Sequence, residues 1–347
     1  MEFKHAVSSH FFRKRSCFFA LLWAPLFTLF LALTAASADV PLTPALDPPK
    51  VIDRISDPDA WPDFAFAPQD DLLEIYFPFI RDQDCAIFRY QGQVWMLDCG
   101  DERAQTEIVP LLSALGITRI DKMINSHPHH DHLNGLYAVN AAAPVQELDI
   151  CFPEDATQHM TAAMEYCKGN GIPVVSFQDE EVMGMGDGFV TFLHWLKASE
   201  LDTVNNRSAV TMVSFGNCNF LFTADIEYQG QRSLFEFVSP EHLKADLLRY
   251  PHHGKSAMIR ELFEAVSPAL AIITNTNRIV ELRESTKFLG YMHVPAVYTN
   301  RPPYVLRFRT DGEHWICDQF AIEVPTPAPA DEVSPEPAGE VSPEPSA

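Results

Sequence analysis

The chain has 347 residues, of which 47% are hydrophobic, so it is long enough to form a core in one large domain or two small ones. Its 25 basic and 47 acidic residues give a net charge of −22. This charge repels DNA and RNA at long range and therefore disfavours, without excluding, a long nucleic acid as partner.

Residues 1–38 have the features of an export signal. Residues 13–15 are basic, residues 17–33 are almost wholly apolar, and residues 36–38 offer a small-residue cleavage pattern. The apolar run is long for a signal peptide and short for a membrane span, so an uncleaved anchor is the alternative. We expect the rest of the chain outside the cytoplasm, secreted or held at the membrane only through this segment.

Composition divides the remainder of the chain. Residues 39–71 are rich in Pro and Asp and are predicted to be a lead-in segment, followed by a folded domain over 72–320. Residues 321–347 are rich in Pro, Ala, Glu and Ser, and they repeat Glu-Val-Ser-Pro-Glu-Pro at 332–337 and 340–345. Such a segment cannot form a core, so we predict a disordered tail.

Strand and helix patterns alternate through the domain. The first half predicts strands at 85–90, 93–98 and 120–124, and helices at 107–115, from about 133, and at 155–168. The second half predicts strands at 189–195, 208–215, 219–223, 270–274, 296–299 and 305–309, and a helix from the cap residue Ser256 to Val266. Two such halves favour an α/β fold in which two sheets pack face to face under covering helices.

Two of the cysteines flank the predicted hairpin. Cys85 begins its first strand and Cys99 follows its second, so the two side chains could lie near one another. An exported chain permits a disulfide here, and a pair of buried thiols is the alternative.

Metal-binding residue types cluster just after the 120–124 strand, at His127, His129, Asp131 and His132. Imidazole nitrogen and carboxylate oxygen are the ligands of zinc and related metals. In an extended segment His127 and His129 point to one side and can share an ion, while Asp131 and His132 turn towards a second. A lone histidine is more often a core or surface residue, but the full pattern followed by Gly135 favours a metal site.

Two later segments offer further ligands. Asp225 follows the apolar strand at 219–223, and a buried acid there is costly unless it is paired or bound to metal. His252 and His253 follow a short, mostly apolar run at 245–248. Alone, Asp225 would be interpreted as a helix cap, but beside the first motif all three become candidate ligands.

Together these motifs resemble a known family. The segment 126–135, Ser-His-Pro-His-His-Asp-His-Leu-Asn-Gly, resembles the signature of the metallo-β-lactamase superfamily, and Asp98-Cys99-Gly100 resembles its Asp-x-Gly turn. Within that family, the metallo-hydrolase domain of the bacterial competence DNA-uptake channel and its free-standing relatives are similar at 205–208, 221–225 and 251–254. The resemblance spans 72–318 and implies an αββα sandwich of two mixed sheets packed face to face, flanked by helices, with a dinuclear site at one edge.

The resemblance also implies a role for each residue. The implied metal ligands are His127, His129, Asp131, His132, Asp225 and His253. Asp225 would bridge two divalent ions, with zinc expected and manganese as the alternative. Asp131 and His252 are the predicted catalytic residues, His252 as a proton donor. Asp98 would orient a ligand histidine through its other ring nitrogen.

Three positions depart from the family pattern. Many members carry another histidine between the first motif and the bridging acid, where this chain has Asn205 and Asn206, so the first metal would be held weakly or completed by water or substrate. Ala224 stands where a glycine is usual. Lys255 is inserted after Gly254, either as a local cation for an anionic substrate or as a solvated loop residue.

The function that we expect is that of an exported, dinuclear metal-dependent hydrolase. Hydroxide activated by the metals would attack a phosphodiester, and the net charge favours a small-molecule or surface-linked substrate. One alternative is a carboxyl-type hydrolase acting on a lactam, lactone or thioester. The other is a non-catalytic relative that only binds metal.

Overall fold

The computed structural model describes residues 72–186, 190–195, 203–275, 284–300 and 302–323, and only the backbone of 190–195 and 284–286. The predicted signal or anchor at 1–38, the lead-in segment at 39–71 and the tail from 324 on lie outside these residues. The domain limits therefore remain predictions. No helix within the described ranges is long and apolar enough to cross a bilayer.

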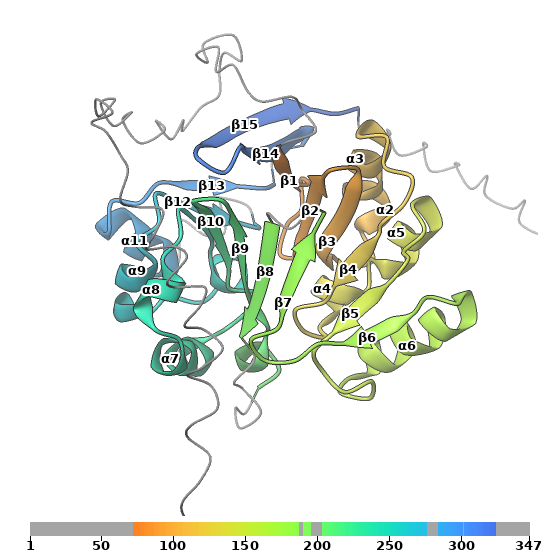
Figure 1. Ribbon diagram of the computed structural model, residues 1–347, viewed down its shortest axis with the longest axis horizontal. Coiled ribbons are helices and arrows are strands. Elements are labelled where there is room, and N and C mark those ends of the chain that lie inside the picture. Colours follow the sequence, from red (N-terminus) through yellow and green to blue (C-terminus); the bar gives the residue numbers. More distant parts are fainter. Residues whose placement is uncertain (1–71, 187–189, 196–202, 276–283, 301, 324–347) are drawn as a thin grey trace, which may run out of the picture. The chain divides into compact units, whose positions relative to one another are not determined.

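The first sheet has the strand order β15-β14-β1-β2-β3-β4-β5-β6 in the described part of the chain (Figure 1). Its antiparallel part runs from β15 to β3, and β3 to β6 are parallel to one another. The strands are β1 (Leu73–Phe77), β2 (Cys85–Tyr90), β3 (Gln93–Cys99), β4 (Lys122–Ile124), β5 (Leu148–Ile150), β6 (Val174–Ser176), β14 (Tyr304–Thr310) and β15 (Trp315–Ala321).

The second sheet has the order β13-β12-β11-β10-β9-β8-β7 over the same described ranges. Here β7 to β10 are antiparallel and β10 to β13 are parallel, so this sheet is mixed like the first. The strands are β7 (Val182–Met185), β8 (Val190–Trp195), β9 (Val210–Phe215), β10 (Cys218–Phe222), β11 (Leu247–Arg249), β12 (Leu270–Ile273) and β13 (Ala296–Tyr298).

Helices cover the outer face of each sheet (Figure 1). Those on the first sheet are α2 (Ala104–Glu107), α3 (Val109–Ala114), α4 (His130–Leu133), α5 (Leu136–Ala142) and α6 (Gln158–Asn170). Those on the second are α7 (Tyr228–Phe237), α8 (Pro240–Leu243), α9 (Arg260–Val266) and α11 (Glu284–Tyr291). Among the described residues, the 3-10 turn η3 (Asn205–Arg207) precedes β9, and the 3-10 turn η4 (Pro251–Gly254) lies between β11 and α9.

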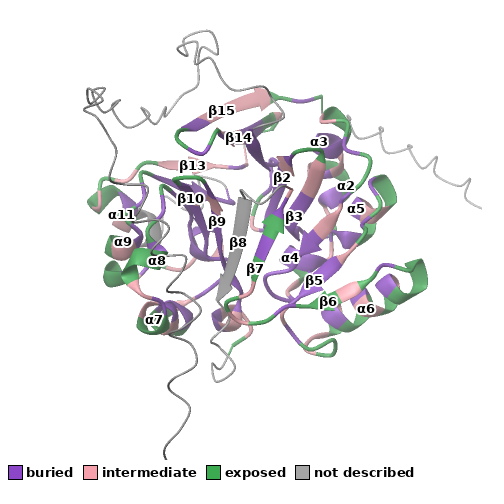
Figure 2. Cartoon of the chain, in the orientation of Figure 1, coloured by how far each residue is buried: buried purple, intermediate pink, exposed green. Residues whose placement is uncertain are grey.

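Side-chain alternation along the strands builds three hydrophobic clusters and explains the layers. In β10, Phe220 and Phe222 point between the sheets while Leu221 packs outward under the helices. The layer between the sheets is aromatic, and Phe77 stacks on Phe222 at 6.1 Å. Figure 2 shows these strands buried and the outer sides of the helices exposed. The predicted αββα sandwich is therefore confirmed.

The strands of the second half do not all join the second sheet. The segment predicted as a late strand at 305–309 is β14, which pairs with β1 at the far edge of the first sheet, with Phe308 opposite Ile75. β15 follows it as a hairpin. Local periodicity identifies such a strand but carries no information on its partner, which is chosen by tertiary packing of Phe308 in the aromatic layer.

Two predicted helices also differ from the structure. The helix expected at 107–115 is α3, which begins two residues later at Val109 and has Pro110 in its first turn as expected, and the separate short helix α2 ends at Glu107 just before it. Ser256 does not cap α9, which begins after Ile259. The Ser256 hydroxyl instead lies 3.2 Å from Nδ1 of His252, and so makes a hydrogen bond to a side chain of the η4 turn.

Cys85 and Cys99 lie opposite one another in the β2–β3 ladder, as the hairpin predicts. Both are buried and both are free thiols, which agrees with the buried-thiol alternative. Burial raises the pKa of each thiol well above its usual value. The Cys99 thiol donates to the carbonyl of Leu133 at 3.3 Å, and so links β3 to the segment that carries the first motif.

Gly135 is required where this motif passes over the end of β3. Its N–H donates to the Gly100 carbonyl at 3.0 Å, and an added Cβ would lie 1.7 Å from the Cys99 carbonyl oxygen. We predict that Gly135→Ala lowers the free energy of unfolding by about 3 kcal/mol, since backbone must move. Gly169→Ala is the control, because its Cβ meets nothing within 4 Å, and it should shift stability by less than about 1 kcal/mol. Urea unfolding measures both, and equal stabilities would contradict this packing.

Candidate metal centre

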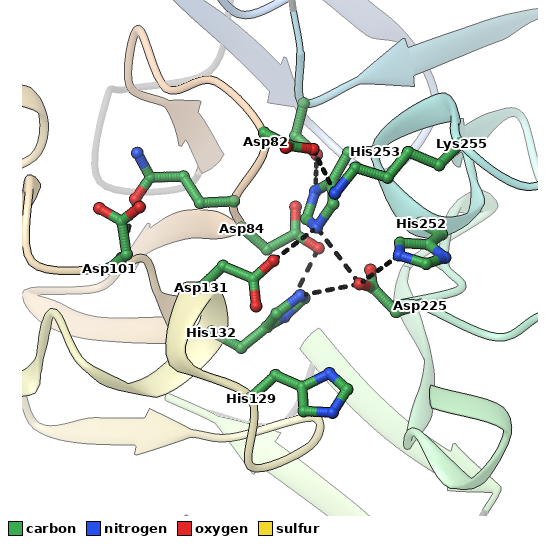
Figure 3. A network of polar contacts seen from close by, with 12 residues as sticks. Asp82, Asp84, Asp101, His129, Asp131, His132, Asp225, His252, His253 and Lys255 are labelled. Carbon is green, nitrogen blue, oxygen red and sulfur yellow. Dashed lines mark hydrogen bonds and ion pairs between the residues drawn. The ribbon is translucent and has the colours of Figure 1, made fainter. Parts of the chain in front are cut away.

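The candidate centre forms where strands from both sheets end. Asp98 lies at the end of β3, the first motif follows β4, and Asp225 follows β10. The η4 turn with His252 and His253 follows β11. Because carboxyl ends of parallel strands share an edge of the sheet, segments far apart in sequence meet here. Figure 3 shows the side chains of Asp131, His132, Asp225, His252 and His253 turned towards one another.

One carboxylate oxygen, Oδ2 of Asp225, lies at the centre of four imidazoles. The Nε2 atoms of His132 and His253 are each 3.2 Å from it, that of His252 is 3.7 Å away, and that of His127 is 4.0 Å away. Asp225 is 1% exposed. Four ring nitrogens of the same type therefore face one buried acid from two separate segments of the chain.

The remaining predicted ligands complete two neighbouring groups. His129 Nδ1 lies 3.1 Å from His127 Nε2, and Asp131 Oδ2 lies 3.4 Å from His253 Nε2. The structure thus brings all six predicted ligands together. His127 and His129 form one group beside Asp225, and the others form the second. Whether they bind metal as assigned remains a prediction.

Unsatisfied ring nitrogens indicate that a cation fits here. Among the described residues, Nε2 of His132 and Nε2 of His253 are buried and make no hydrogen bond of good geometry, although each lies 3.2 Å from Oδ2 of Asp225. Buried nitrogens with such incomplete partners are costly, and a bound cation would satisfy them. Ligand atoms of Asp84, His132, Asp225 and His253 also all lie within 4.8 Å of one another. Nitrogen and carboxylate donors at this spacing match the preferences of zinc-like divalent ions.

A neighbouring acid and a hydroxyl hold two of these rings in the orientation that a metal requires. Asp98 Oδ2 lies 2.8 Å from Nδ1 of His132, and Asp98 also accepts from the Ser126 N–H at 2.8 Å. Thr274 Oγ1 lies 2.9 Å from Nδ1 of His253. Arg249 Nη2, which can only donate, lies 3.0 Å from the same nitrogen of His253, so it is in His132 that the contacts favour a proton on Nδ1. Nε2 of His132 is then left to face a cation. Asp98 therefore has the contact that the family resemblance implies.

Burial and charge together set the protonation of the cluster. Burial alone would lower the pKa of His132 and His253, but the neighbouring acids together outweigh it and raise both, Asp225 and Asp98 for His132, and Asp225 and Asp131 for His253. Burial would likewise raise the pKa of Asp225, but the two imidazoles hold it well below its usual value. For His127 burial dominates and lowers the pKa well below the usual range. Protons and metal ions therefore compete for the nitrogens nearest Asp225.

The sequence did not identify Arg249, a fully buried guanidinium at the end of β11. Its Nε donates to Asp84 Oδ1 at 2.9 Å, its Nη2 pairs with the other Asp84 oxygen, and its Nη1 donates to the Ala224 carbonyl. Nη2 also lies 3.4 Å from Oδ1 of Asp225 and 3.1 Å from the Thr274 hydroxyl. Arg249 thus holds one oxygen of Asp225 and leaves Oδ2 to the imidazoles. A charged residue at the end of a buried strand was the available signal.

Asp84, in the loop before β2, was also missed, since no pattern surrounds it. Burial raises its pKa, and Arg249 opposes that effect. Lys255, the inserted residue, pairs with Asp82 at 2.5 Å and is 26% exposed on its side chain. It is therefore held beside the centre rather than solvated alone (Figure 3).

Three non-glycine residues around Asp225 have left-handed backbone. Ala224 has φ +44°, His252 has φ +50° and His253 has φ +51°. This conformation costs of order 1 kcal/mol for a residue with a Cβ, which explains why glycine suits position 224 in relatives. The His252 N–H donates to the Ala224 carbonyl at 3.0 Å and locks the two turns together. The strain directs both imidazoles towards Asp225.

Arg249 should be the cation on which the metal-free fold depends. We predict that Arg249→Met lowers the free energy of unfolding by about 3–5 kcal/mol, because it leaves Asp84 buried without a partner. Arg260→Met is the control: this side chain is 58% exposed and pairs with Glu264, so the change should cost under about 1 kcal/mol. Both are measured by urea unfolding in a chelator. Similar losses for the two variants would contradict the role of Arg249.

The chain is similar to several known proteins. The chain is 25% identical to ComE operon protein 3 of Bacillus subtilis (strain 168), in an alignment that covers 48% of this chain and 21% of that protein. It is 28% identical to competence protein ComA of Neisseria gonorrhoeae, where the alignment covers 50% of this chain and 22% of that protein. The chain therefore spans about a fifth of the length of these relatives. Among solved structures it is similar to the diiron β-hydroxylase CmlA from Streptomyces venezuelae (TM-score 0.43, 13% identity, 70% of this chain and 54% of that one) and to a diphosphatase from the PhnP family (TM-score 0.37, 12% identity, 58% and 85%).

A family model described as the metallo-beta-lactamase superfamily matches residues 80–273, which is more than half of the chain. That segment contains every predicted ligand. The chain belongs to the metallo-beta-lactamase superfamily, as its motifs predicted.

Proposed function

We propose that this protein is an exported hydrolase that uses two divalent metal ions to cleave small or surface-linked phosphodiesters. The observation that carries the proposal is the convergence of His132, His253, His252 and His127 on Oδ2 of Asp225. A buried cluster of this composition has no structural purpose that an apolar core would not serve better. The superfamily is generally hydrolytic, and the assignment of this chain as a phosphodiesterase is ours.

Charge balance supports two ions and an anionic substrate. The buried described residues of the cluster include four carboxylates, those of Asp84, Asp98, Asp131 and Asp225, and one guanidinium, that of Arg249. With neutral histidines this leaves three negative charges. One divalent ion leaves the site negative, whereas two make it positive by one charge. A site with that charge suits a phosphodiester, which carries one negative charge, better than a neutral lactam or thioester.

The residues of the candidate centre have different roles in the proposed reaction. Two bound divalent cations would supply Lewis acidity and would lower the pKa of a water molecule. Asp98 and Thr274 keep Nε2 of His132 and His253 turned inward, and Asp131 adds a carboxylate beside His253. His252 is 18% exposed on its side chain, against 0% for His253, so it is the imidazole best placed to exchange a proton with a substrate.

Two features support a small or surface-linked substrate over a polynucleotide. The net charge of −22 repels polyanions at long range. Two cations next to the centre are also already paired, Arg249 with Asp84 and Lys255 with Asp82. Neither offers a free positive charge along which a nucleic-acid backbone could lie.

Export rests on the features of residues 1–38, and a direct test is available. We predict that protein recovered from outside the cytoplasm begins at Asp39, since the small residues 36–38 precede it. Amino-terminal sequencing of that material measures this. An intact amino terminus in the membrane fraction would indicate the anchor instead, and recovery only from the cytoplasm would overturn export.

The phosphodiesterase proposal is tested with the purified protein and added zinc or manganese, using bis-p-nitrophenyl phosphate. We predict metal-dependent turnover that Asp225→Asn reduces by at least about 100-fold, because that change removes the acid at the centre of the cluster. Asp155→Asn is the control, since Asp155 is exposed, and it should retain wild-type rates.

The rival functions give different results in the same experiment. Faster hydrolysis of nitrocefin or of a thioester than of the phosphodiester would favour a carboxyl-type hydrolase. Faster cleavage of single-stranded DNA would contradict the substrate size argued from charge. A folded protein without turnover of any of these substrates would favour a non-catalytic relative.

A further inference from the structure

One arginine at the edge of the centre has not been given a role. Arg207 ends the η3 turn, and the central carbon of its guanidinium lies 5.3 Å from the centroid of the buried Phe152 ring. The side chain forms no ion pair with an acid in the described part of the chain, whereas Arg249 is paired with Asp84. Arg207 is therefore a half-buried cation whose charge no described carboxylate neutralises.

The segment 205–209, which contains η3, is hydrogen-bonded to both sides of the candidate centre. Ala209 donates its N–H to the carbonyl of Ser126 at 2.9 Å, and Ser126 directly precedes the predicted ligand His127. On the other side, Asn206 Oδ1 accepts from the N–H of Glu227, the residue before α7, at 3.1 Å. These contacts give the turn a fixed place at the edge of the centre.

The same turn holds polar atoms that the fold leaves unsatisfied. Nε of Arg207, Oδ1 of Asn205 and Oγ of Ser208 are buried and have no hydrogen-bond partner among the described residues. Each such atom is costly, and in a native structure it generally marks a place that a ligand, an ion or water completes. A guanidinium beside a hydroxyl offers positive charge and N–H and O–H donors, which suit an oxyanion.

Phe152 holds the guanidinium on the side of the first motif. The ring is 6% exposed, and the thiol of Cys151 next to it donates at 3.3 Å to the same Ser126 carbonyl that Ala209 contacts. A guanidinium packed over an aromatic ring is held by that contact, and its planar fork can bind two oxygens of one phosphate or carboxylate group. The side chain is therefore prepared for an anion that the protein itself does not supply.

We propose that Arg207 binds a second anionic group of the substrate, at a subsite beside His127 and His129. This rests on the proposed phosphodiesterase function and narrows its substrate to a small diester with one arm that ends in a phosphate or carboxylate group. The reacting phosphoryl group would lie at Asp225, and the guanidinium would hold the end of the arm. A single guanidinium fits one such group and does not form the row of cations that a nucleic-acid backbone needs.

The kinetic test compares three p-nitrophenyl phosphodiesters with the same three-carbon arm, which ends in a hydroxyl, a carboxylate or a phosphate group. For at least one anionic ester we expect the wild type to have a KM about 10- to 100-fold below that of the hydroxyl ester, at a similar kcat. The ester with the lower KM identifies the anion. Arg207→Met should remove the difference by raising the KM of the anionic ester alone, and Arg207→Lys, which keeps the charge, should restore part of it.

A guanidinium that only packs on Phe152 predicts a different result, in which Arg207→Met affects all three esters equally through a displaced turn. Arg260→Met is the matched control, because Arg260 also lies over an aromatic ring, that of Tyr291 at 5.9 Å, but is paired with Glu264. It should leave every KM unchanged. Equal losses in Arg207→Met on all three esters, or a wild type with the same KM for all three, would overturn the proposal.

A second measurement separates the subsite from the proposed function. The nitrogen-15 spectrum of the zinc-loaded protein contains the Nε–H signal of Arg207, which Arg207→Lys identifies by its absence. We expect inorganic phosphate to shift this signal in the wild type and in folded Asp225→Asn, while the Arg260 signal stays in place. An inactive wild type with this response would refute the phosphodiesterase and keep the subsite. A signal that phosphate does not move, or moves only while Asp225 is intact, would overturn the subsite even in an active enzyme.

Discussion

The centre depends on one constraint, which is that the carboxylate of Asp225 is buried and must be neutralised by groups brought to it from elsewhere. Its two oxygens are used differently. Oδ1 faces the guanidinium of Arg249, while Oδ2 faces the Nε2 atoms of four imidazoles. An isolated ionised acid at this depth would be strongly unfavourable. The fold is therefore stable with this acid only because the charges around it are arranged to meet it.

The two sheets make that arrangement possible. The segments that supply the histidines follow strands in the parallel parts of the two sheets, β3 to β6 and β10 to β13. After these strands the chain continues into a helical connection and does not form a hairpin. The aromatic layer around Phe77, Phe220 and Phe222 fixes the sheets to one another directly below. Since the polar groups lie on strand ends rather than on long loops, their spacing is set by the core. Such support is what a preorganised metal site needs.

How much the sequence could predict depended on how local the information was. His127, His129, Asp131 and His132 lie within six positions of one motif, and all were predicted and brought together. Asp225 and His253 were predicted because each follows an apolar strand. Arg249 and Asp84 were missed, because they are 165 positions apart and only the closed sandwich makes them partners. The return of β14 to β1 was missed for the same reason. The buried Asn206 accepts a hydrogen bond from the Gly230 N–H of α7, a contact that likewise exists only in the folded domain.

The central claim is that the cluster around Asp225 holds two cations. Anomalous diffraction from crystals grown with zinc or manganese tests it most directly. The account predicts two peaks, one among Asp131, His132, Asp225 and His253 at roughly 2.0–2.2 Å from the ligand atoms, and a second beside His127 and His129. Crystals that contain the metal but show no peak within this cluster would contradict it.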